Sequence, residues 1–372
     1  MQIAFRVDSS ALVGSGHLMR CLALARELTR RGARVHFVTR ASAGNLNHLI
    51  RDAGYAVHEL APVVDDRHAM DHTCWKPGEI QADLSETVRI LALLGPVEWL
   101  VIDNYGIDAR WEKPLRRCVR RIAVIDDLAN RDHDADVLVD QNLFRHMDAR
   151  YEGRLPPNCQ ALLGPGYALL RPEFREHRER RMQQAGHDGA VRVLAFFGGG
   201  DTSDETGKFL RGWRESADSN WSVDVVLGGS NSRVCALSAF AAPLSGVRIR
   251  HQIGNMAELM AASDYAFGAA GSSNWERFCL GLDASVVCVA DNQRETVETL
   301  SELGLVHYIG NAEKTDAAAY AYALAQLKSR TASMIKPSAR LMEYVDGLGA
   351  PKVADTLFAV ADEPCRSVQE RV

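Results

Sequence analysis

The chain alternates short apolar runs with longer stretches in which apolar residues recur every three or four positions. Ile3–Val7, Val35–Thr39 and Trp99–Asp103 are short and rich in β-branched residues, which is typical of buried strands. Between the first two runs, residues 17–31 carry apolar side chains at helical spacing, and Gly32 marks the end of that helix. Strands that alternate with helices predict a doubly wound parallel sheet.

The same alternation occurs twice along the chain. Because 372 residues exceed the ~250–300 that one hydrophobic core usually serves, we expect two domains. Proline- and glycine-bearing segments followed by a charged stretch separate the two halves. Further strands are predicted at Ile122–Asp126, Ala135–Asp140, Val191–Phe197, Ser222–Leu227, Val247–Arg250, Tyr265–Gly268 and Ala284–Val289. The expected division is an N-terminal domain at 1–155, a linker at 156–190, a second domain at 191–345, and a C-terminal helix and tail at 346–372.

Composition narrows the range of partners. The 43 Lys and Arg residues are scattered and the formal charge is -5, so we expect no nucleic-acid partner. No apolar run approaches the ~20 residues that span a bilayer, and the first residues lack the pattern of a signal peptide. A cytoplasmic protein without a membrane partner is therefore expected. The eight cysteines form no CxxC pair, and we expect neither metal nor cofactor. The sequence leaves the oligomeric state open.

One glycine turn in the first half carries candidate chemistry. Gly14 and Gly16 lie where the first strand turns into the first helix, and Arg20 follows one turn into that helix. Glycines allow close approach to a ligand, and the free N–H groups of a helix amino end suit phosphate oxygens. His17 opens the helix and is a candidate general base, because imidazole exchanges protons near neutral pH. A histidine that only binds phosphate or caps the helix is the alternative.

Two further residues of the first half follow strand ends. Tyr105 comes after the strand that ends at Asp103, so it is predicted to face the ligand cleft. Packing at the surface is the competing interpretation. Asp8 ends the first strand and is a candidate for orienting His17 or binding a hydroxyl, although a turn residue would look the same.

In the second half, four loops follow predicted strands and are candidates for holding a diphosphate and a ribose. Glycines permit close approach, small residues at a helix amino end suit phosphate, and a carboxylate one turn into the helix can accept from ribose hydroxyls. Turns and caps are the alternatives, and Ser273 with Glu276 also fits a capping box. The candidates are Gly200, Asp201, Gly229, Ser272, Ser273, Glu276, Asn292 and Gln293.

Taken together, these stretches make the chain similar to a known family. It resembles the UDP-2,4-diacetamido-2,4,6-trideoxy-β-L-altropyranose hydrolases of pseudaminic acid biosynthesis. The stretches that carry the resemblance are FRVDSSALVGSGHLMRCLALA from Phe5, DNYGID from Asp103, IDDLANRDHDADVLVDQN from Ile125, LLGPGYALLRPEF from Leu162, NMAELM from Asn255, GSSNWERFCLGL from Gly271 and DNQR from Asp291.

The resemblance implies an α/β protein of the GT-B type, with two Rossmann-like doubly wound parallel-sheet domains that face each other across a cleft. It implies a metal-independent attack of water on the anomeric carbon of a UDP-sugar, which releases UDP and inverts that centre. The family's proposed base falls on His17, its cleft tyrosine on Tyr105, and a further UDP contact on Met256. Asn104, where the family often has histidine, and Asn274 depart from the family pattern, which affects the sugar expected.

Overall fold

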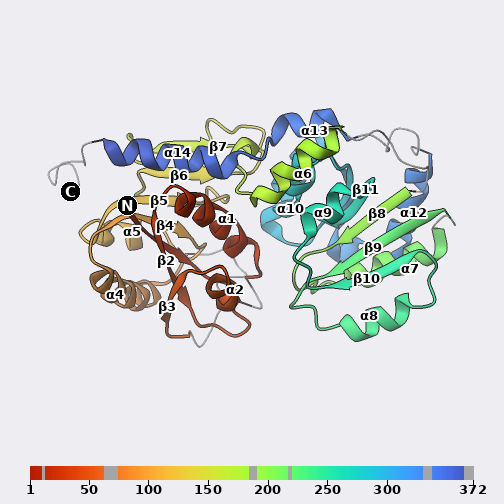
Figure 1. The fold of residues 1–372 in the computed structure, drawn as a ribbon, viewed down its shortest axis with the longest axis horizontal. Helices are drawn as coiled ribbons and strands as arrows, with labels where there is room; N and C mark the ends of the chain where they lie inside the picture. Colours follow the sequence, from red (N-terminus) through yellow and green to blue (C-terminus); the bar gives the residue numbers. More distant parts are fainter. Residues whose placement is uncertain (11–12, 63–73, 184–190, 217–219, 330–336, 364–372) are drawn as a thin grey trace. The chain divides into compact units, whose positions relative to one another are not determined.

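The structure is a computed structural model that describes residues 1–10, 13–62, 74–183, 191–216, 220–329 and 337–363. The described chain forms two compact units. The first unit comprises residues 1–142, 146–170 and the part after 348, and the second comprises 143–145 and 171–347. Each unit contains one parallel sheet with helices packed against it (Figure 1). The predicted α/β class with two doubly wound parallel sheets is confirmed.

The sheet of the first unit has the strand order β3-β2-β1-β4-β5-β6-β7, with every pairing parallel. Its helices are α1 (Gly16–Arg30), α2 (Asn47–Asp52), α4 (Pro77–Leu94), α5 (Ala109–Leu115) and α14 (Gly349–Asp362), with a short helix η1 (Pro165–Tyr167). The strands are β1 (Gln2–Val7), β2 (Arg34–Arg40), β3 (Ala56–Leu60), β4 (Val97–Asp103), β5 (Val119–Ile125), β6 (Val137–Asp140) and β7 (Gln160–Leu163).

Alternate residues of the central strand bury opposite faces of this sheet. Ile3, Phe5 and Val7 join the core beneath α1 and α14, whereas Ala4 joins the core beneath α4 and α5. A strand buried on both faces reads as a continuous apolar run, which is why the sequence predicts it well. The indole N–H of Trp99 donates to the Leu357 carbonyl of α14 at 3.1 Å.

The sheet of the second unit has the order β10-β9-β8-β11-β12-β13, again parallel throughout. Its strands are β8 (Val191–Phe196), β9 (Trp221–Leu227), β10 (Val247–His251), β11 (Tyr265–Ala269), β12 (Ala284–Cys288) and β13 (His307–Asn311). The helices are α6 (Pro172–Gln183), α7 (Glu205–Ser216), α8 (Val234–Ala241), α9 (Met256–Ala261), α10 (Ser273–Cys279), α11 (Arg294–Glu302), α12 (Ala317–Lys328) and α13 (Ala339–Tyr344), with short helices η2 (Asp291–Gln293) and η3 (Ala312–Lys314).

The boundaries differ from the sequence expectation in two places. The segment expected as a linker, 156–190, contains β7, η1 and α6, and the chain passes from the first unit to the second at residues 170–171. The helix expected at 346–372 is α14, but it belongs to the first unit, because the chain leaves the second unit at a turn after α13, where Gly347 has φ +78. The chain re-enters the first unit there. Residues 184–190 and 364–372 of these expected segments lie outside the described residues.

Three strands have no counterpart in the sequence prediction: β3, β7 and β13. Their side chains are largely exposed or half-buried, and each strand lies at or beside a sheet edge. Partial burial leaves polar residues in the strand, so the continuous apolar run that marks a buried strand is missing.

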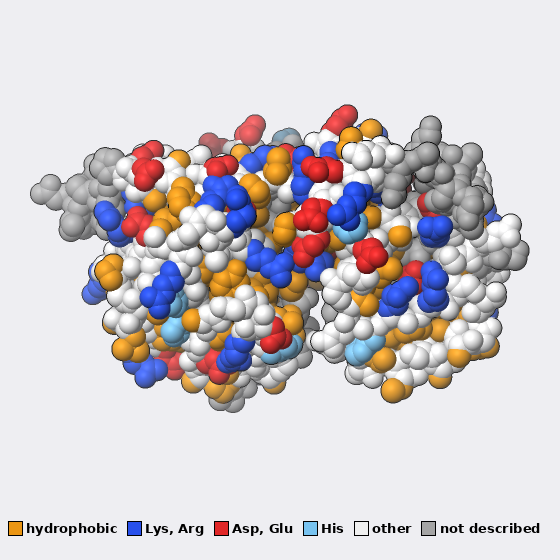
Figure 2. Space-filling model, viewed as in Figure 1, with side chains coloured by type: hydrophobic (Ala, Val, Ile, Leu, Met, Phe, Trp, Pro, Cys, Tyr) orange, Lys and Arg blue, Asp and Glu red, His pale blue; other side chains and the backbone are white. Residues whose placement is uncertain are grey.

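No helix of the described segments combines the length and apolar character needed to cross a membrane. On the face shown in Figure 2, Lys and Arg side chains are interspersed with Asp and Glu side chains.

Packing of α7 against α12 depends on a glycine. A Cβ on Gly212 would lie 2.7 Å from the Ala317 carbonyl oxygen and 2.8 Å from the Ala321 nitrogen. We predict that Gly212→Ala lowers the free energy of unfolding by about 1–3 kcal/mol, because overpacking outweighs the ~1 kcal/mol gain in helix propensity. Urea unfolding measures this. Gly78→Ala, where nothing lies within 4 Å, is the control and should not destabilise. A Gly212→Ala protein as stable as the parent would contradict the packing described.

Candidate functional site

In the first unit, the candidate residues gather where the strand order reverses. Strands β1 and β4 are neighbours, and the connections after them lead to opposite sides of the sheet. In open α/β sheets, ligands bind at this switch point outside the carboxyl ends of the strands. His17 lies in the first turn of α1, and Asp103 is the last residue of β4. The topology therefore brings together two residues that are far apart in the sequence.

His17 and Asp103 form a close pair. The imidazole Nδ1 lies 2.5 Å from Asp103 Oδ1, and the Asp103 carboxylate is fully buried. A proton on Nδ1 that is donated to this carboxylate leaves the lone pair on Nε2. Nε2 has no hydrogen-bond partner among the described residues, and the His17 side chain is 12% exposed. The pair is therefore arranged to accept a proton at Nε2.

Arg20 fixes the Asp103 carboxylate of the His17–Asp103 pair. Its Nε and Nη2 donate to both oxygens of Asp103 at 2.6 and 2.7 Å, and its Nη1 donates to Asp127 Oδ2 at 2.9 Å. Arg20 is one helical turn after His17, so both side chains leave the same face of α1. Arg20 was expected as a substrate contact, but the structure engages its guanidinium with two carboxylates of the protein. Its predicted contact with substrate stays a prediction.

The carboxylates around Arg20 are ionised. Burial alone would raise the pKa of Asp103, but the charge of Arg20 and the hydrogen bonds from Arg20 and His17 outweigh it and hold that pKa well below its usual range. Burial likewise opposes ionisation of Asp127, and the Arg20 charge and the Tyr105 hydroxyl lower its pKa. Burial also opposes the charge of Arg20, whose pKa is nevertheless raised well above normal by Asp103 and Asp127. The cluster therefore contains two negative charges and one positive charge.

Tyr105 completes the group. Its hydroxyl donates to Asp127 Oδ1 at 2.6 Å, and its ring meets the His17 ring edge-to-face with 4.5 Å between centroids. Burial and the Asp127 charge raise the pKa of Tyr105 well above its usual value, so the phenol stays protonated. Tyr105 was predicted to face the ligand cleft, and the structure places its half-buried ring beside the candidate base.

Asp8 has different partners from those considered in the sequence analysis. Its carboxylate pairs with the buried Arg6 at 2.6 and 2.8 Å, and it accepts from the Arg40 backbone at 2.7 Å and the Asn104 amide at 2.8 Å. Asp103, not Asp8, is the carboxylate that orients His17. Asn104 is held at both ends of its amide, since its Oδ1 accepts from the Gly106 N–H at 2.8 Å.

The glycines of the first turn shape the start of α1. Gly14 has φ +76, which a residue with a side chain adopts only with strain, and its N–H donates to the Ser10 carbonyl at 3.0 Å. Gly16 is the first residue of α1 and is exposed. The backbone is therefore exposed at Gly16, and the ligand contact predicted for this turn stays a prediction.

In the second unit, the candidate loops follow neighbouring strands at the equivalent switch point, between β8 and β11. The loops after β8 and β9 touch, because a Cβ on Gly228 would lie 2.3 Å from the Gly199 oxygen. The loops after β11 and β12 are also close, since a Cβ on Gly271 would lie 3.3 Å from Gln293 Nε2. Glycines at these contacts let four loops crowd one edge of the sheet.

Asp201 takes the capping role that the sequence left open. Its two carboxylate oxygens accept from the backbone N–H groups of Glu205 and Thr206 at 2.8 and 3.0 Å. This is an amino-terminal cap of α7. Gly200 precedes it in the loop, and Gly229 lies beside the Gln252 side chain.

Glu276 differs from its neighbours because its carboxylate has no hydrogen-bond partner among the described residues. No side-chain bond caps α10, so the capping box that Ser273 and Glu276 could have formed is absent from this helix. Burial raises the pKa of Glu276, against the opposing charges of Arg171 and Arg277. A half-buried carboxylate at a helix amino end, beside the exposed Ser272, is suited to accept hydrogen bonds from a ligand.

The Asn274 side chain points into the interior of the second unit, unlike the half-buried Glu276. It is fully buried, its Nδ2 donates to the Ala270 carbonyl at 3.1 Å, and its Oδ1 accepts from Arg277. This departure from the family pattern therefore supports the interior of the second unit. Met256 is the first residue of α9 and is also buried. Asn292 and Gln293 lie in η2, and Gln293 Oε1 accepts from the Val289 N–H at 3.2 Å.

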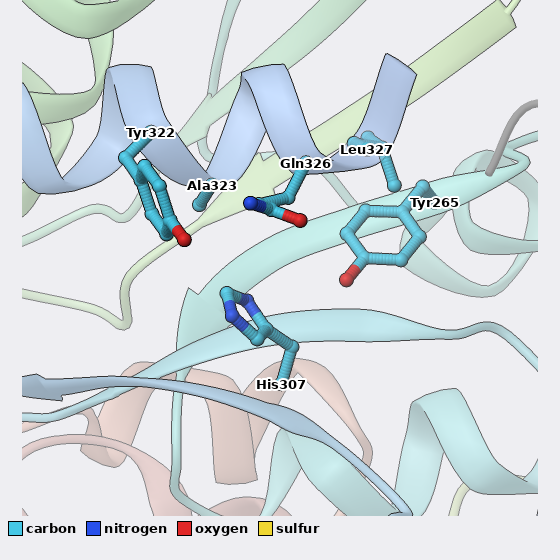
Figure 3. Close-up of a pocket in the computed structure, with 6 residues that line it drawn as sticks. All are labelled: Tyr265, His307, Tyr322, Ala323, Gln326 and Leu327. Carbon is cyan, nitrogen blue, oxygen red and sulfur yellow. The ribbon is translucent and has the colours of Figure 1, made fainter. Parts of the chain in front are cut away.

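A cavity of about 220 Å³ in the second unit lies away from these loops. Side chains of α12, including Tyr322 and Gln326, face Tyr265 and His307 across it (Figure 3). Tyr265 begins β11 and His307 begins β13, so the cavity opens at the amino edge of the sheet. The candidate loops follow the carboxyl edge, so this cavity is not part of the candidate site.

Comparison with known proteins supports the predicted resemblance. No family model matches the chain. The chain is 25% identical over 310 residues to the UDP-2,4-diacetamido-2,4,6-trideoxy-beta-L-altropyranose hydrolase of Campylobacter jejuni, which covers 82% of this chain and 97% of that protein. The resemblance expected from the sequence is confirmed.

Solved structures extend the comparison to the fold. MurG of Acinetobacter baumannii superposes with a TM-score of 0.64 at 15% identity, over 96% of this chain and 99% of MurG. A transferase from Siraitia grosvenorii, solved in complex with UDP, superposes with a TM-score of 0.60 at 12% identity, over 96% of this chain and 99% of the transferase. The chain has a GT-B fold. In this GT-B protein the described residues contain no group of three or more His, Cys, Asp or Glu side chains able to hold a metal ion.

Two further buried carboxylates, Asp126 and Asp140, lie around the Tyr151 hydroxyl. The Tyr151 hydroxyl lies 3.0 Å from Asp126 Oδ2 and 3.1 Å from Asp140 Oδ2. One phenol proton cannot serve both carboxylates, so a proton on Asp140 supplies the second donor. Burial, together with the charge of Asp127, raises the pKa of Asp140 to about 7.

Asp140 should therefore make stability depend on pH. Its folded pKa lies above the unfolded value, so its contribution is complete in acid and is lost as pH rises through 7. Between pH 5 and 8 the parent should lose about 2–3 kcal/mol relative to Asp140→Asn. Urea unfolding at both values measures this, with Asp132→Asn as the exposed control. An equal change in the parent and Asp140→Asn would show that Asp140 is ionised throughout.

Proposed function

We propose that this protein hydrolyses a UDP-sugar at its anomeric carbon and that His17 is the general base. The observation that carries the proposal is the buried Asp103 carboxylate on His17 Nδ1, which leaves Nε2 to accept a proton at the switch point of a nucleotide-binding type of sheet. The similarity to the Campylobacter jejuni hydrolase supports the reaction type. A soluble, cytoplasmic enzyme of nonulosonic acid biosynthesis is part of the proposal.

In the proposed reaction, Nε2 of His17 takes a proton from water while the water oxygen bonds to the anomeric carbon. The bond from that carbon to the phosphate oxygen breaks, and UDP leaves with the electron pair. Attack opposite the leaving group inverts the centre. The positive imidazolium that forms is stabilised by the Asp103 carboxylate, which stays ionised throughout. The sugar proposed is 2,4-diacetamido-2,4,6-trideoxy-β-L-altropyranose.

The carboxyl-edge loops of the second unit are proposed to hold the nucleotide. Backbone N–H groups of the loops at Gly198–Gly200 and Gly271–Ser273 suit the diphosphate, and the Glu276 carboxylate suits the two ribose hydroxyls. The solved Siraitia grosvenorii transferase, which shares the fold, contains UDP, and this supports a UDP site.

A glycosyltransferase is the second candidate, because the solved structures include glycosyltransferases of the same fold. One experiment separates the two, and it also tests a protein that only binds the nucleotide sugar. The protein is incubated with the UDP-sugar and EDTA, without an acceptor, and the anomeric protons are followed by NMR. Hydrolysis to UDP and free sugar supports the proposal. An intact donor that turns over only when an acceptor is added supports the transferase, and binding without turnover supports neither enzyme.

His17→Ala should lower kcat by about 10²–10⁴-fold and leave the affinity for UDP nearly unchanged, because a general base acts only in the transition state. Steady-state kinetics and calorimetric titration with UDP measure the two quantities. His48→Ala, at an exposed histidine of α2, is the matched control. A parallel loss of turnover and UDP affinity in His17→Ala would make His17 a binding residue.

Glu276→Gln should weaken UDP binding about tenfold, because a neutral amide accepts hydrogen bonds from ribose less strongly than a carboxylate. The parent should also prefer UDP over 2′-deoxy-UDP, and the variant should lose much of that preference. Calorimetric titration with both nucleotides measures this. Glu298→Gln, at an exposed position of α11, is the control. An unchanged preference in Glu276→Gln would remove Glu276 from the ribose site.

A further inference from the structure

Asp127 links Tyr105 to the group that holds His17, and the rings of His17 and Tyr105 lie beside each other in the candidate site. It lies just after β5, and its two oxygens face different partners: Oδ1 accepts from the Tyr105 hydroxyl at 2.6 Å and Oδ2 from Arg20 at 2.9 Å. Arg20 also donates to Asp103, and Asp103 is hydrogen-bonded to His17. The His17 and Tyr105 rings are therefore linked through Asp103, Arg20 and Asp127 as well as through their direct contact.

The backbone also fixes Asp127. The Arg150 guanidinium donates to the Asp127 carbonyl at 2.9 Å and to Asp140 Oδ2 at 3.1 Å. The side chain is 10% exposed, and its hydrogen bonds leave it little freedom to rotate. Since Arg20 is also buried, loss of one carboxylate would leave part of its charge without a partner.

The charges around His17 do not balance. Among the described residues, Asp103, Arg20 and Tyr105 contact the imidazole. Asp127 does not contact it but is hydrogen-bonded to Arg20 and Tyr105. The two carboxylates exceed the one guanidinium by one negative charge. This surplus is neutralised when His17 becomes a cation. Without Asp127 the cluster would be neutral before proton transfer and positive after it.

We propose that Asp127 is a positioning residue: through Arg20 and Tyr105 it fixes the imidazole against the phenol ring, and its charge favours the protonated state of His17 during turnover. The inference rests on the proposed function for the second effect, whereas the first is a property of the free protein. The two effects can therefore be measured separately.

The positioning is tested by NMR on protein with labelled His and Tyr side chains and no substrate. A nuclear Overhauser contact between the His17 and Tyr105 rings is expected in the parent and is expected to be lost or reduced several-fold in Asp127→Asn. Asp126→Asn is the matched control, since Asp126 is the neighbouring buried carboxylate and its side chain accepts hydrogen bonds from Leu128, Ala129 and Tyr151. A contact of equal strength in all three proteins overturns the positioning.

The charge effect is tested by the pH dependence of kcat/KM. In Asp127→Asn the acid limb should move to lower pH by about one unit while kcat falls about tenfold or more, because an imidazolium is less favoured without the second carboxylate. UDP affinity should stay unchanged. Asp127→Glu keeps the charge but displaces it, so its acid limb should stay in place while kcat falls.

The outcomes separate this inference from the proposed function. If the parent does not hydrolyse the UDP-sugar, the proposed function fails, and the ring contact still tests the positioning. If the parent hydrolyses it but Asp127→Asn keeps the parent's acid limb and ring contact, the role of Asp127 is overturned and the hydrolase stands. Should Asp127→Asn not fold, Asp127→Glu decides: kcat equal to the parent overturns the positioning.

Discussion

The site of the first unit depends on one guanidinium shared between two buried carboxylates. Arg20 comes from α1, Asp103 from the end of β4, and Asp127 from the connection after β5. A buried charge is unfavourable unless it is paired and hydrogen-bonded, so this arrangement is stable only when all three segments are in place. The ionic contacts thus tie the first helix to two strand ends, and the position of the His17 imidazole follows from them.

The two units place different kinds of residue at the same point of a shared strand topology. In both, the candidate residues follow the carboxyl ends of strands at the point where the strand order reverses. The first unit fills this point with ionisable side chains that hold each other in hydrogen bonds. The second unit fills it with glycine loops in close contact. Ionisable side chains are suited to proton transfer, whereas the backbone N–H groups of glycine loops are suited to binding anions.

The sequence predicted the two sheets because their central strands are buried on both faces and form continuous apolar runs. It did not predict the half-exposed edge strand β3, because apolar and polar residues in this strand do not separate onto two faces. His17 was identified from the glycine turn, but its partner was not, since Asp103 looks like several other carboxylates that end strands. Only the strand order, which places β4 beside β1, distinguishes it. The sequence around Asp8 likewise does not indicate its hydrogen-bond partners, because Arg6 and Asn104 reach Asp8 only in the folded unit.

The return of α14 to the first unit has a consequence for biosynthesis. The first unit contains the earliest residues of the chain, yet its core includes side chains of α14 beyond residue 348, and the indole of Trp99 depends on a carbonyl of that helix. On the ribosome the second unit can complete its core before the first one can. The apolar face that α14 covers stays open for most of translation, so a nascent chain of this protein has a longer period of exposure to aggregation or chaperone binding than two consecutive domains would have.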